Sequence, residues 1–449
     1  MDKIEADVFC LTGQDRKLLA PATQATVLAK YSRSPESART IVGKLTDEEA
    51  NKFQEKWVVN YGHNSVAELA SIPVCFEGIS IVASKFIESW QRPGYSEKST
   101  RYQKFSSDSF VTPPGSSATM KLFADKFYRA YEELMDPMIR ICAVKMGKDP
   151  DDPKSLSDRT VKARAFDNLR YLLPAGTGTN VAVNAYVRDF RDMIVGLSSH
   201  SNPEFNSIGK KLHAAVSEMT PTLVNHTDPD GSRLSINSIG KTPDCFDVKF
   251  PDHYVRLRPD SSDPVIIENE FKLLVDSFHG MSWETFSRYM ELRTQWQEVP
   301  EVFKNVSITY EMMMDYGAFR DLQRHRRCTQ FVEPLTINYG YLVPDDIKGS
   351  PLESTYRETM EAINNYDDES VIHNVNLMQY MIPLGYLHRS MFMMDLKEAY
   401  YVTELRTRPQ GHISYRRIAY QMFLEASKRY PELMKWCRAI KPDTIEVHN

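Results

Sequence analysis

The chain has 449 residues, 42% of them apolar and 26% charged, a composition typical of folded globular proteins that excludes a disordered or fibrous one. Because ordinary domains hold roughly 100 to 200 residues, two or three domains are expected. The net charge of -5 gives no general attraction for a polyanion, and no stretch approaches the ~20 apolar residues of a membrane span. The first ten residues lack the basic and apolar parts of a signal peptide, so we expect a cytoplasmic protein that binds neither nucleic acid nor membrane.

The cysteines are scattered and form no Cys-x-x-Cys pair, so the sequence predicts neither a zinc ribbon nor a dithiol redox motif. We expect reduced and mostly buried thiols. Cys328 lies in a basic run, where a low-pKa nucleophile is the alternative to a structural role. His63 and Glu68 do not share a helical face at a metal-ligand spacing, and no metal site is predicted.

The first half of the chain gives a clear order of signals. A polar segment at residues 61–68 precedes an alternating stretch at 72–81, which predicts a strand, and an apolar periodic stretch at 82–90, which predicts a helix. A charged loop follows at 91–105, and helical periodicity covers 123–146. A later helix is expected after a Leu-Pro turn.

The second half repeats this order, with a predicted strand at 306–312, a helix at 313–323 and a charged loop at 324–341. The segments 168–186 and 377–395 each run from apolar residues through proline and a glycine-containing loop into a predicted apolar helix. Such parallels suggest an internal duplication, and chance similarity of two amphipathic segments is the alternative.

Helical periodicity also covers 271–293 and 414–436. We therefore predict an α+β (mixed α/β) protein of two repeats, each a small twisted sheet packed with long helices. A stretch rich in Pro, Gly, Asp and Ser lies between the halves and predicts a connection. The predicted boundaries are 1–225 for the first repeat, 226–264 for the linker and 265–449 for the second repeat.

The run from Arg324 to Arg327 holds three guanidinium groups and an imidazole, which suits phosphate or an electron-rich ring. A solvated basic helix end is the alternative. In the first half, Glu97, Ser99 and Arg101 alternate, so in an extended loop all three would face one polar ligand. An exposed loop of mixed charge is the alternative there.

A polar bend at 404–412, fixed by Pro and Gly, projects arginine and histidine side chains between two predicted helices, as ligand-binding loops do. The string Gly-Thr-Gly-Thr at 176–179 resembles a phosphate loop but lacks the Gly-Lys-Ser/Thr ending that makes this motif specific.

In this order the segments resemble the flavin-dependent thymidylate synthases, whose signature is Arg-His-Arg followed by a loop with Glu-x-Ser-x-Arg-Tyr. The second half has the triplet at 324–326, but the expected serine falls at 334–335, a Pro-Leu pair. The first half has the loop at 97–102, whereas its triplet position falls near 89–91, Ser-Trp-Gln. The signature is thus divided between the halves.

Other features of that family are divided in the same way. Residues 62–68 look like the upstream flavin-binding segment of the family. Arg170 and Arg406 match family arginines that bind the nucleotide, one in each half. Asn184 resembles the flavin-contacting asparagine, for which the second half has Asp395.

The resemblance implies three groups of site residues. Those implied in catalysis are Arg324, His325 and Arg326. Those implied in substrate binding are Glu97, Ser99, Arg101, Arg170 and Arg406. Those implied in cofactor binding are His63, Ser65, Glu68, Asn184 and His412.

The activity that the resemblance implies is methylation of deoxyuridine monophosphate (dUMP) to dTMP, with FAD as cofactor and NADPH and methylenetetrahydrofolate as co-substrates. Because each half keeps what the other lacks, we expect composite sites, with Arg101 and Arg324 in one nucleotide pocket. Family members are homotetramers, so a homodimer of this chain is expected to form a pseudo-tetramer. The alternatives are a flavoprotein that modifies another pyrimidine nucleotide and a non-catalytic nucleotide-binding relic.

Overall fold

The computed structural model describes residues 19–32, 34–54, 64–101, 103–221, 223–224, 227–231, 253–258 and 262–442. They divide between two units. Unit 1 is drawn from residues 1–77, 92–97 and 180–239, and unit 2 from residues 78–91, 98–179 and 240–449.

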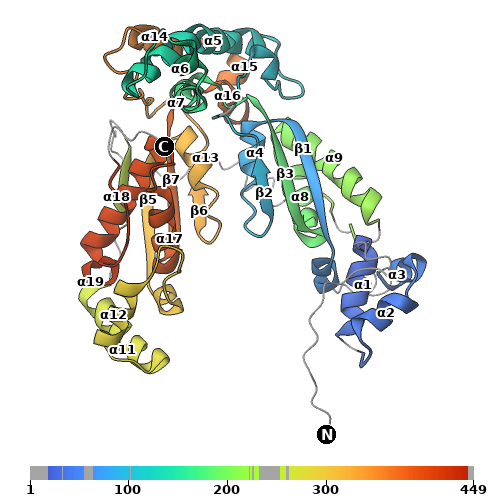
Figure 1. The fold of residues 1–449 in the computed structure, drawn as a ribbon. Helices are drawn as coiled ribbons and strands as arrows, with labels where there is room; N and C mark the ends of the chain where they lie inside the picture. The colour runs from blue at the N-terminus through green and yellow to red at the C-terminus, as the bar shows by residue number, and fades with distance from the viewer. Residues whose placement is uncertain are drawn as a thin grey trace. The chain divides into compact units, whose positions relative to one another are not determined.

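Unit 1 combines a cluster of short helices with a small sheet (Figure 1). The helices α1 (Pro21–Tyr31), α2 (Ala38–Lys44) and α3 (Asp47–Gln54) are followed by a 3-10 turn, η2 (Asn64–Leu69). The sheet has the order β1-β3-β2, from β1 (Ser71–Ser80), β2 (Gly94–Glu97) and β3 (Gly178–Tyr186). Two helices complete the unit, α8 (Val187–Ser198) and α9 (Pro203–Met219). Apolar side chains of α8 recur at helical spacing and are buried, namely Phe190, Met193, Ile194 and Leu197.

Unit 2 contains a second antiparallel sheet of order β4-β5-β7-β6. Its strands are β4 (Tyr254–Leu257), β5 (Ser307–Asp315), β6 (Thr329–Val332) and β7 (Leu387–Asp395). The elements that follow or precede them are α11 (Pro264–His279), α12 (Trp283–Leu292), η5 (Glu301–Asn305), α13 (Tyr316–Leu322), α17 (Leu396–Arg406), α18 (Ile413–Arg429) and α19 (Pro431–Met434). The methionine run at 312–314 is buried in β5, as a core role predicts.

A helical layer completes unit 2. Its elements are α4 (Ile81–Ile87), η3 (Ser107–Ser109), α5 (Thr119–Lys145), α6 (Pro153–Ser157), α7 (Arg159–Leu169), η4 (Arg170–Leu172), α14 (Glu353–Glu361), η6 (Ala362–Asn365), α15 (Glu369–Ile372) and α16 (Val375–Met381). Arg164 of α7 donates two hydrogen bonds to Asp346, from Nε at 2.7 Å and from Nη2 at 2.9 Å. This bidentate pair joins a helix of the first half of the sequence to a loop of the second.

The same order of elements occurs twice. Strands β5-β7-β6 follow the order of β1-β3-β2, and β4 is added at the edge. Both β3 and β7 have 9 residues and lie 209 positions apart, while α4 and α13 have 7 residues and lie 235 positions apart. These matches confirm the predicted mixed α/β class with two repeats. They also set Ser89 opposite Arg324 and Pro334 opposite Ser99.

Within unit 2 the Leu-Pro and Ile-Pro turns of the two repeats pair with each other, with Pro174 opposite Pro383. The hydrogen bond from Ala175 N to Ile382 O is 2.9 Å, and its mirror, from Leu384 N to Leu173 O, is also 2.9 Å. A second mirrored pair runs from Gly176 N to Tyr380 O, at 2.8 Å, and from Gly385 N to Tyr171 O, at 3.0 Å. Each bond maps onto its partner by the 209-residue offset, which is the pattern of a two-fold, self-complementary interface.

Glycines in this pairing allow the backbones to approach closely, and their substitution tests it. A Cβ on Gly176 would lie 2.5 Å from the Phe110 ring and 2.8 Å from the Tyr380 carbonyl oxygen. Because that carbonyl is held in the pairing, we expect Gly176→Ala to lower the free energy of unfolding by about 1 to 3 kcal/mol in urea titrations. Gly231→Ala is the control, since a Cβ on Gly231 would meet nothing within 4 Å, and it should stay within about 0.5 kcal/mol of wild type. Equal stabilities of the two variants would contradict the close approach.

Several details differ from the sequence-based expectations. The segments after the Leu-Pro and Ile-Pro turns, expected to be helices, are the strands β3 and β7, and alternate residues of β3 are buried. Residues 313–315, expected to begin a helix, continue strand β5. The helix predicted over 414–436 is two helices, because α18 ends at Arg429 and a proline, Pro431, begins α19.

The helix predicted over 271–293 is two helices, because Gly280 takes a left-handed conformation (φ 59°) that ends α11. Strand β4 lies inside the predicted connection and pairs with β5, so part of that stretch belongs to the sheet. The 209-residue offset sets Met393, rather than Asp395, opposite Asn184.

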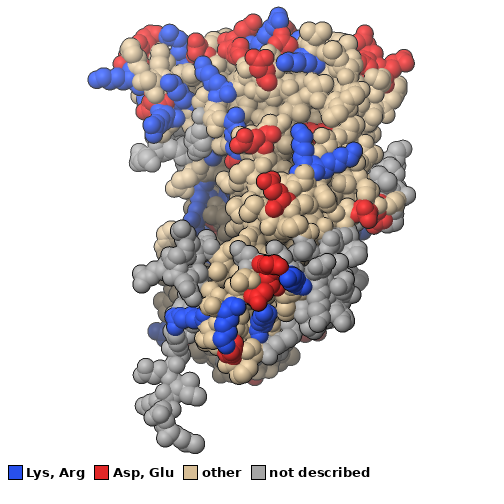
Figure 2. Space-filling view, turned by 90° about the vertical axis from the view of Figure 1, so that its right-hand side faces the viewer, with Lys and Arg blue, Asp and Glu red and all other residues tan. Residues whose placement is uncertain are grey.

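Among the described residues, none of the helices has both the length and the apolar character that crossing a membrane requires. On the face drawn in Figure 2, basic side chains are interspersed with acidic ones.

Candidate functional site

The two units divide the residues that the resemblance singles out. Unit 2 contains Ser99, Arg101, Arg170, Arg324, His325, Arg326, Arg406 and His412, and unit 1 contains Glu97, Ser65, Glu68 and Asn184. His63 lies outside the described residues, as does the side chain of Ser65.

Arg101 is fixed in the loop that follows β2. The Ser99 hydroxyl accepts a hydrogen bond from the Arg101 backbone N–H at 3.1 Å, a local turn that shapes the loop. The guanidinium grips Asp167 with two hydrogen bonds, Nε to Oδ1 at 2.7 Å and Nη2 to Oδ2 at 2.8 Å. Burial disfavours the charged guanidinium, but Asp167 outweighs this and raises the pKa of Arg101. Arg101 is therefore a permanent cation at this position.

Arg170 lies beside this pair, where α7 passes into η4, and is buried. Its Nη2 is 3.7 Å from Oδ2 of Asp321, and among the described residues its Nε and Nη2 make no hydrogen bond. Despite burial, Asp167 and Asp321 help to raise the pKa of Arg170. A buried guanidinium with unmet donors is suited to an anionic ligand.

Arg406, from the second repeat, reaches the same place. Its guanidinium carbon lies 5.5 Å from the centre of the Tyr415 ring, a cation–π distance. Burial raises the pKa of Tyr415, with Asp321 acting in the same direction and Arg101 and Arg406 against it. Arg101, Arg170 and Arg406 thus act on one group of side chains within unit 2. The structure brings together three predicted nucleotide-binding arginines, two from the first repeat and one from the second.

His412 is adjacent but turned into the protein. Its Nδ1 accepts a hydrogen bond from Ser414 N at 3.2 Å, which caps α18, and its Nε2 lies 3.3 Å from the carbonyl oxygen of Asp167. Burial, with the charge of Arg170, lowers the pKa of His412 to about 4. The structure gives this neutral imidazole a place inside the protein, and its contact with a cofactor stays a prediction.

His325, the centre of the Arg-His-Arg run, is buried between the side chains of Arg406 and Glu398. Its Nε2 receives a hydrogen bond from Nε of Arg406 at 2.7 Å, and its Nδ1 lies 3.3 Å from Oε1 of Glu398. Burial lowers the pKa of His325 well below its usual value, and Arg406 and Arg324 add to this. His325 is therefore neutral near pH 7.

The arginines around His325 face outward to different degrees. Arg324 and Arg327 are exposed, and Arg326 is half-buried. The loop backbone is held by Gln330, whose side-chain amide donates to the His325 carbonyl at 2.7 Å. The Cys328 thiol also points to that carbonyl, at 2.9 Å, and burial raises the pKa of this thiol to about 12. Cys328 is thus a structural residue, and the alternative of a reactive thiolate is wrong.

In unit 1, Glu68 at the end of η2 is held by two arginines. Its Oε1 accepts a hydrogen bond from Nη1 of Arg92 at 3.2 Å and another from Nη1 of Arg188. Arg92 also pairs with the buried Asp189 of α8, at 2.5 Å. Asn184 lies on the exposed face of β3. The roles of Glu68 and Asn184 in cofactor binding stay predictions.

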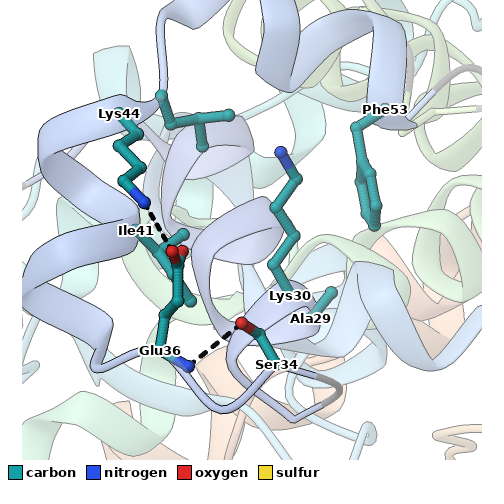
Figure 3. A pocket seen from close by; sticks show the side chains of 8 residues that line it. Ala29, Lys30, Ser34, Glu36, Ile41, Lys44 and Phe53 are labelled. Carbon is teal, nitrogen blue, oxygen red and sulfur yellow. Dashed lines mark hydrogen bonds and ion pairs between the residues drawn. The ribbon is translucent and has the colours of Figure 1, made fainter.

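A pocket of about 310 Å³ lies among α1, α2 and α3, and none of the candidate site residues lines it (Figure 3). The apolar residues that line it are Ala29, Ile41, Leu45 and Phe53, and Lys30 lies over the Phe53 ring at 5.7 Å. Lys44 on its rim is paired with Glu36. The pocket has no described side chain that would select one ligand class.

Sequence reasoning missed the acids that organise the arginines, namely Asp167, Asp321 and Glu398. One local signal was present, because Asp167 stands three residues before Arg170, the spacing of neighbours on a helix. Asp321 stands three residues before Arg324 in the same way. Glu398 is 73 residues from its partner His325, so only the tertiary structure identifies it.

Comparison with known proteins places this sequence in a family. The family described as thymidylate synthase complementing protein matches residues 17–222 and 275–432, one segment in each half. These segments cover most of the chain. The chain belongs to this family.

Individual relatives fall into two lengths. A UPF0159 protein of Chlamydia pneumoniae is 27% identical over 95% of this chain and 90% of its own. A flavin-dependent thymidylate synthase of Sulfurisphaera tokodaii is 26% identical over 45% of this chain and 72% of its own. A crystal structure of the flavin-dependent thymidylate synthase of Helicobacter pylori, complexed with FAD and dUMP, matches 46% of this chain and 94% of its own at 15% identity, with a TM-score of 0.33.

Proposed function

We propose that this chain is a flavin-dependent thymidylate synthase that methylates dUMP to dTMP at sites composed from both repeats. FAD is its cofactor, and methylenetetrahydrofolate and NADPH are its co-substrates. The protein acts in the cytoplasm as a homodimer in which four repeats form a pseudo-tetramer. Family membership supports the class of reaction, and the arrangement of the arginines supports the nucleotide.

The gathering of Arg101, Arg170 and Arg406 carries this proposal. These three guanidinium groups come from distant parts of the chain, and the family resemblance implies that each binds the nucleotide. Arg101 is paired with Asp167, Arg170 lies 3.7 Å from Asp321, and Arg406 lies 5.5 Å from the centre of the Tyr415 ring. Guanidinium groups bind phosphate through paired N–H donors, so this cluster suits the phosphate of a nucleotide.

The chain's residues have separate tasks in the proposed reaction. Arg101 and Arg170 bind the phosphate, while Ser99 shapes the loop that presents Arg101. Arg406 and Arg324 bind the nucleotide and stabilise negative charge that develops on the pyrimidine, as fixed cations do in a site with little water. Glu97 of β2, half-buried at the loop entrance, accepts a hydrogen bond from the sugar or the base.

The residues at the turn after α13 fit FAD. Arg324, Arg326 and Arg327 lie within four positions and extend from the buried His325 toward solvent, which suits the two phosphates of a dinucleotide. When bound, reduced FAD supplies the hydride that completes the methyl group. Glu68, Ser65, His63, Asn184 and His412 are proposed to complete the flavin site.

The test is release of tritium from dUMP labelled at carbon 5, with FAD, NADPH and methylenetetrahydrofolate present. We expect purified protein to be yellow and to release tritium only with all components. Arg324→Ala should lower the flavin content of the protein several-fold, because removing a charged hydrogen bond costs about 1.5 to 3 kcal/mol. Absorbance at the flavin bands measures this content.

Ser89→Ala is the matched control, because Ser89 is the first-repeat counterpart of Arg324 and, in the described part of the chain, its hydroxyl bonds only to the nearby Phe86 O, at 2.7 Å. Equal flavin loss in the two variants would contradict the assignment of Arg324. A yellow protein without tritium release would point to another pyrimidine nucleotide or one-carbon donor. A colourless protein that binds nucleotide would indicate a non-catalytic relic.

A further inference from the structure

Glu398 lies in the first turn of α17 and is buried beside His325. Its backbone N–H is held by the side chain of Asp395, which caps the helix at 2.8 Å. The carboxyl group therefore starts from a fixed backbone. Together with the contacts of His325, this forms a chain of three side chains, Glu398, His325 and Arg406.

The chemistry of arginine decides the proton position in this chain. A guanidinium is always a donor, so the hydrogen bond of 2.7 Å from Arg406 Nε requires an unprotonated Nε2 on His325. The proton of the neutral imidazole must then lie on Nδ1, which faces Oε1 of Glu398 at 3.3 Å. Without an acceptor at Nδ1 the proton could move to Nε2, where two donors would oppose each other and displace the guanidinium.

The orientation of Arg406 follows from these contacts. His325 holds Nε, and the Tyr415 ring lies under the guanidinium at 5.5 Å. Among the described residues, the terminal nitrogens of Arg406 make no hydrogen bond, so both N–H groups can grip one oxyanion together. Such a bidentate contact requires a fixed guanidinium plane.

The first repeat lacks the counterparts of His325 and Arg406, and its counterpart of Glu398 has a different partner. By the offsets of the repeats, Trp90 stands opposite His325, Leu197 opposite Arg406 and Asp189 opposite Glu398. Asp189 is paired with Arg92 instead, at 2.5 Å. The equivalent of Arg92 in the second repeat is Arg327, which is exposed and lies 3.8 Å from Glu298. Glu398 is therefore not paired with this arginine and contacts His325 instead.

We propose that Glu398 is a positioning residue of the nucleotide site, which acts through the imidazole of His325 to hold Arg406 toward the ligand. This inference rests on the proposed function, since the ligand of Arg406 is a nucleotide there. Burial raises the pKa of Glu398 to about 7, although Arg327 opposes this, so the group need not be charged to accept from His325. A glutamine, which keeps the acceptor oxygen, should therefore replace it.

The experiment compares the wild type with Glu398→Gln and Glu398→Leu, with ¹⁵N-labelled histidine in each protein. The His325 signals are assigned by their loss in His325→Gln. We expect Nδ1 to be protonated in the wild type and in Glu398→Gln, and the proton to move wholly or partly to Nε2 in Glu398→Leu. Titration with dUMP should show about tenfold weaker binding for Glu398→Leu and a change below about twofold for Glu398→Gln.

Glu425→Leu is the control, because it removes an acid of α18 that pairs with Lys428, and its dUMP affinity should be that of the wild type. Wild-type dUMP affinity with an unmoved proton in Glu398→Leu would overturn the proposal, as would a tenfold loss in Glu398→Gln. If Glu398→Leu does not fold, Glu398→Asp withdraws the carboxyl group by one methylene and provides the same readout. If the wild type binds no dUMP, the proposed function fails, while the NMR comparison still decides whether Glu398 sets the proton and the hold on Arg406.

Discussion

Replacing Asp167 by alanine should lower the free energy of unfolding by about 3 to 5 kcal/mol, the largest stability change that we expect from one site residue. Asp167 is the bidentate partner of Arg101 and lies in the field of the buried Arg170. Without Asp167, the guanidinium groups of Arg101 and Arg170 would remain buried with too little negative charge beside them. Urea unfolding at neutral pH measures the difference.

The control for this variant is Asp151→Ala, which removes an Asp–Arg pair of the surface. Arg140 and Asp151 lie 2.6 Å apart, but their side chains are 53% and 83% exposed, and such pairs contribute less than about 1 kcal/mol. If Asp167→Ala lowered the free energy of unfolding by as little as Asp151→Ala, the buried pair of Asp167 and Arg101 would contribute little to stability.

The pH dependence provides a second check on Asp167. Burial would raise the pKa of its carboxyl group, but His412, Arg101 and Arg170 hold the pKa below 3.8, the value of a free aspartate. Its contribution is therefore complete above pH 3.8 and is lost as acid protonates the folded carboxylate. The difference in the free energy of unfolding between the wild type and Asp167→Ala should become smaller below that pH.

Arg101→Ala and Arg406→Ala should each weaken dUMP binding by roughly ten- to a hundredfold, because each removes a charged hydrogen bond of about 1.5 to 3 kcal/mol from the ligand. Both guanidinium groups act on Tyr415 although they come from different repeats. Residues that share one ligand couple, so the double variant should lose less than the product of the two single losses. Isothermal titration with dUMP measures all three.

Arg140→Ala, which removes an exposed arginine of α5, should leave dUMP affinity unchanged. Losses that multiply fully in the Arg101/Arg406 double variant would indicate two separate anion sites. The Arg101/Arg324 pair, predicted from the sequence to share a pocket, belongs in the same series. Arg324 is exposed in the turn after α13. Its effect on dUMP binding should depend on Arg101 if Arg324 contacts the nucleotide, and should be independent of Arg101 if Arg324 contacts the flavin.

Much of the architecture was predictable because its signals are local. The alternation of residues 72–81 coincides with β1 to within a residue, and the periodicity of 123–146 falls in α5, which begins four residues earlier. Motif spacing then aligned the repeats, since Ser89 opposite Arg324 and Pro334 opposite Ser99 follow from elements of equal length. The alignment was less secure where no motif anchors it, and Asn184 was matched two positions away from its counterpart.

The sequence by itself determined the family and the two repeats and singled out the candidate site arginines, because these depend on residue type and on spacing along the chain. Only the tertiary structure decided which acidic, basic and imidazole side chains contact each other. Arg101 finds Asp167 at a separation of 66 residues, His325 finds Glu398 at 73, and Arg406 finds His325 at 81. Such pairs depend on how the elements pack against each other, and electrostatic partners are chosen by distance in space. For this reason the sequence did not predict which acids hold the arginines. It also did not predict the proton position inferred for Nδ1 of His325.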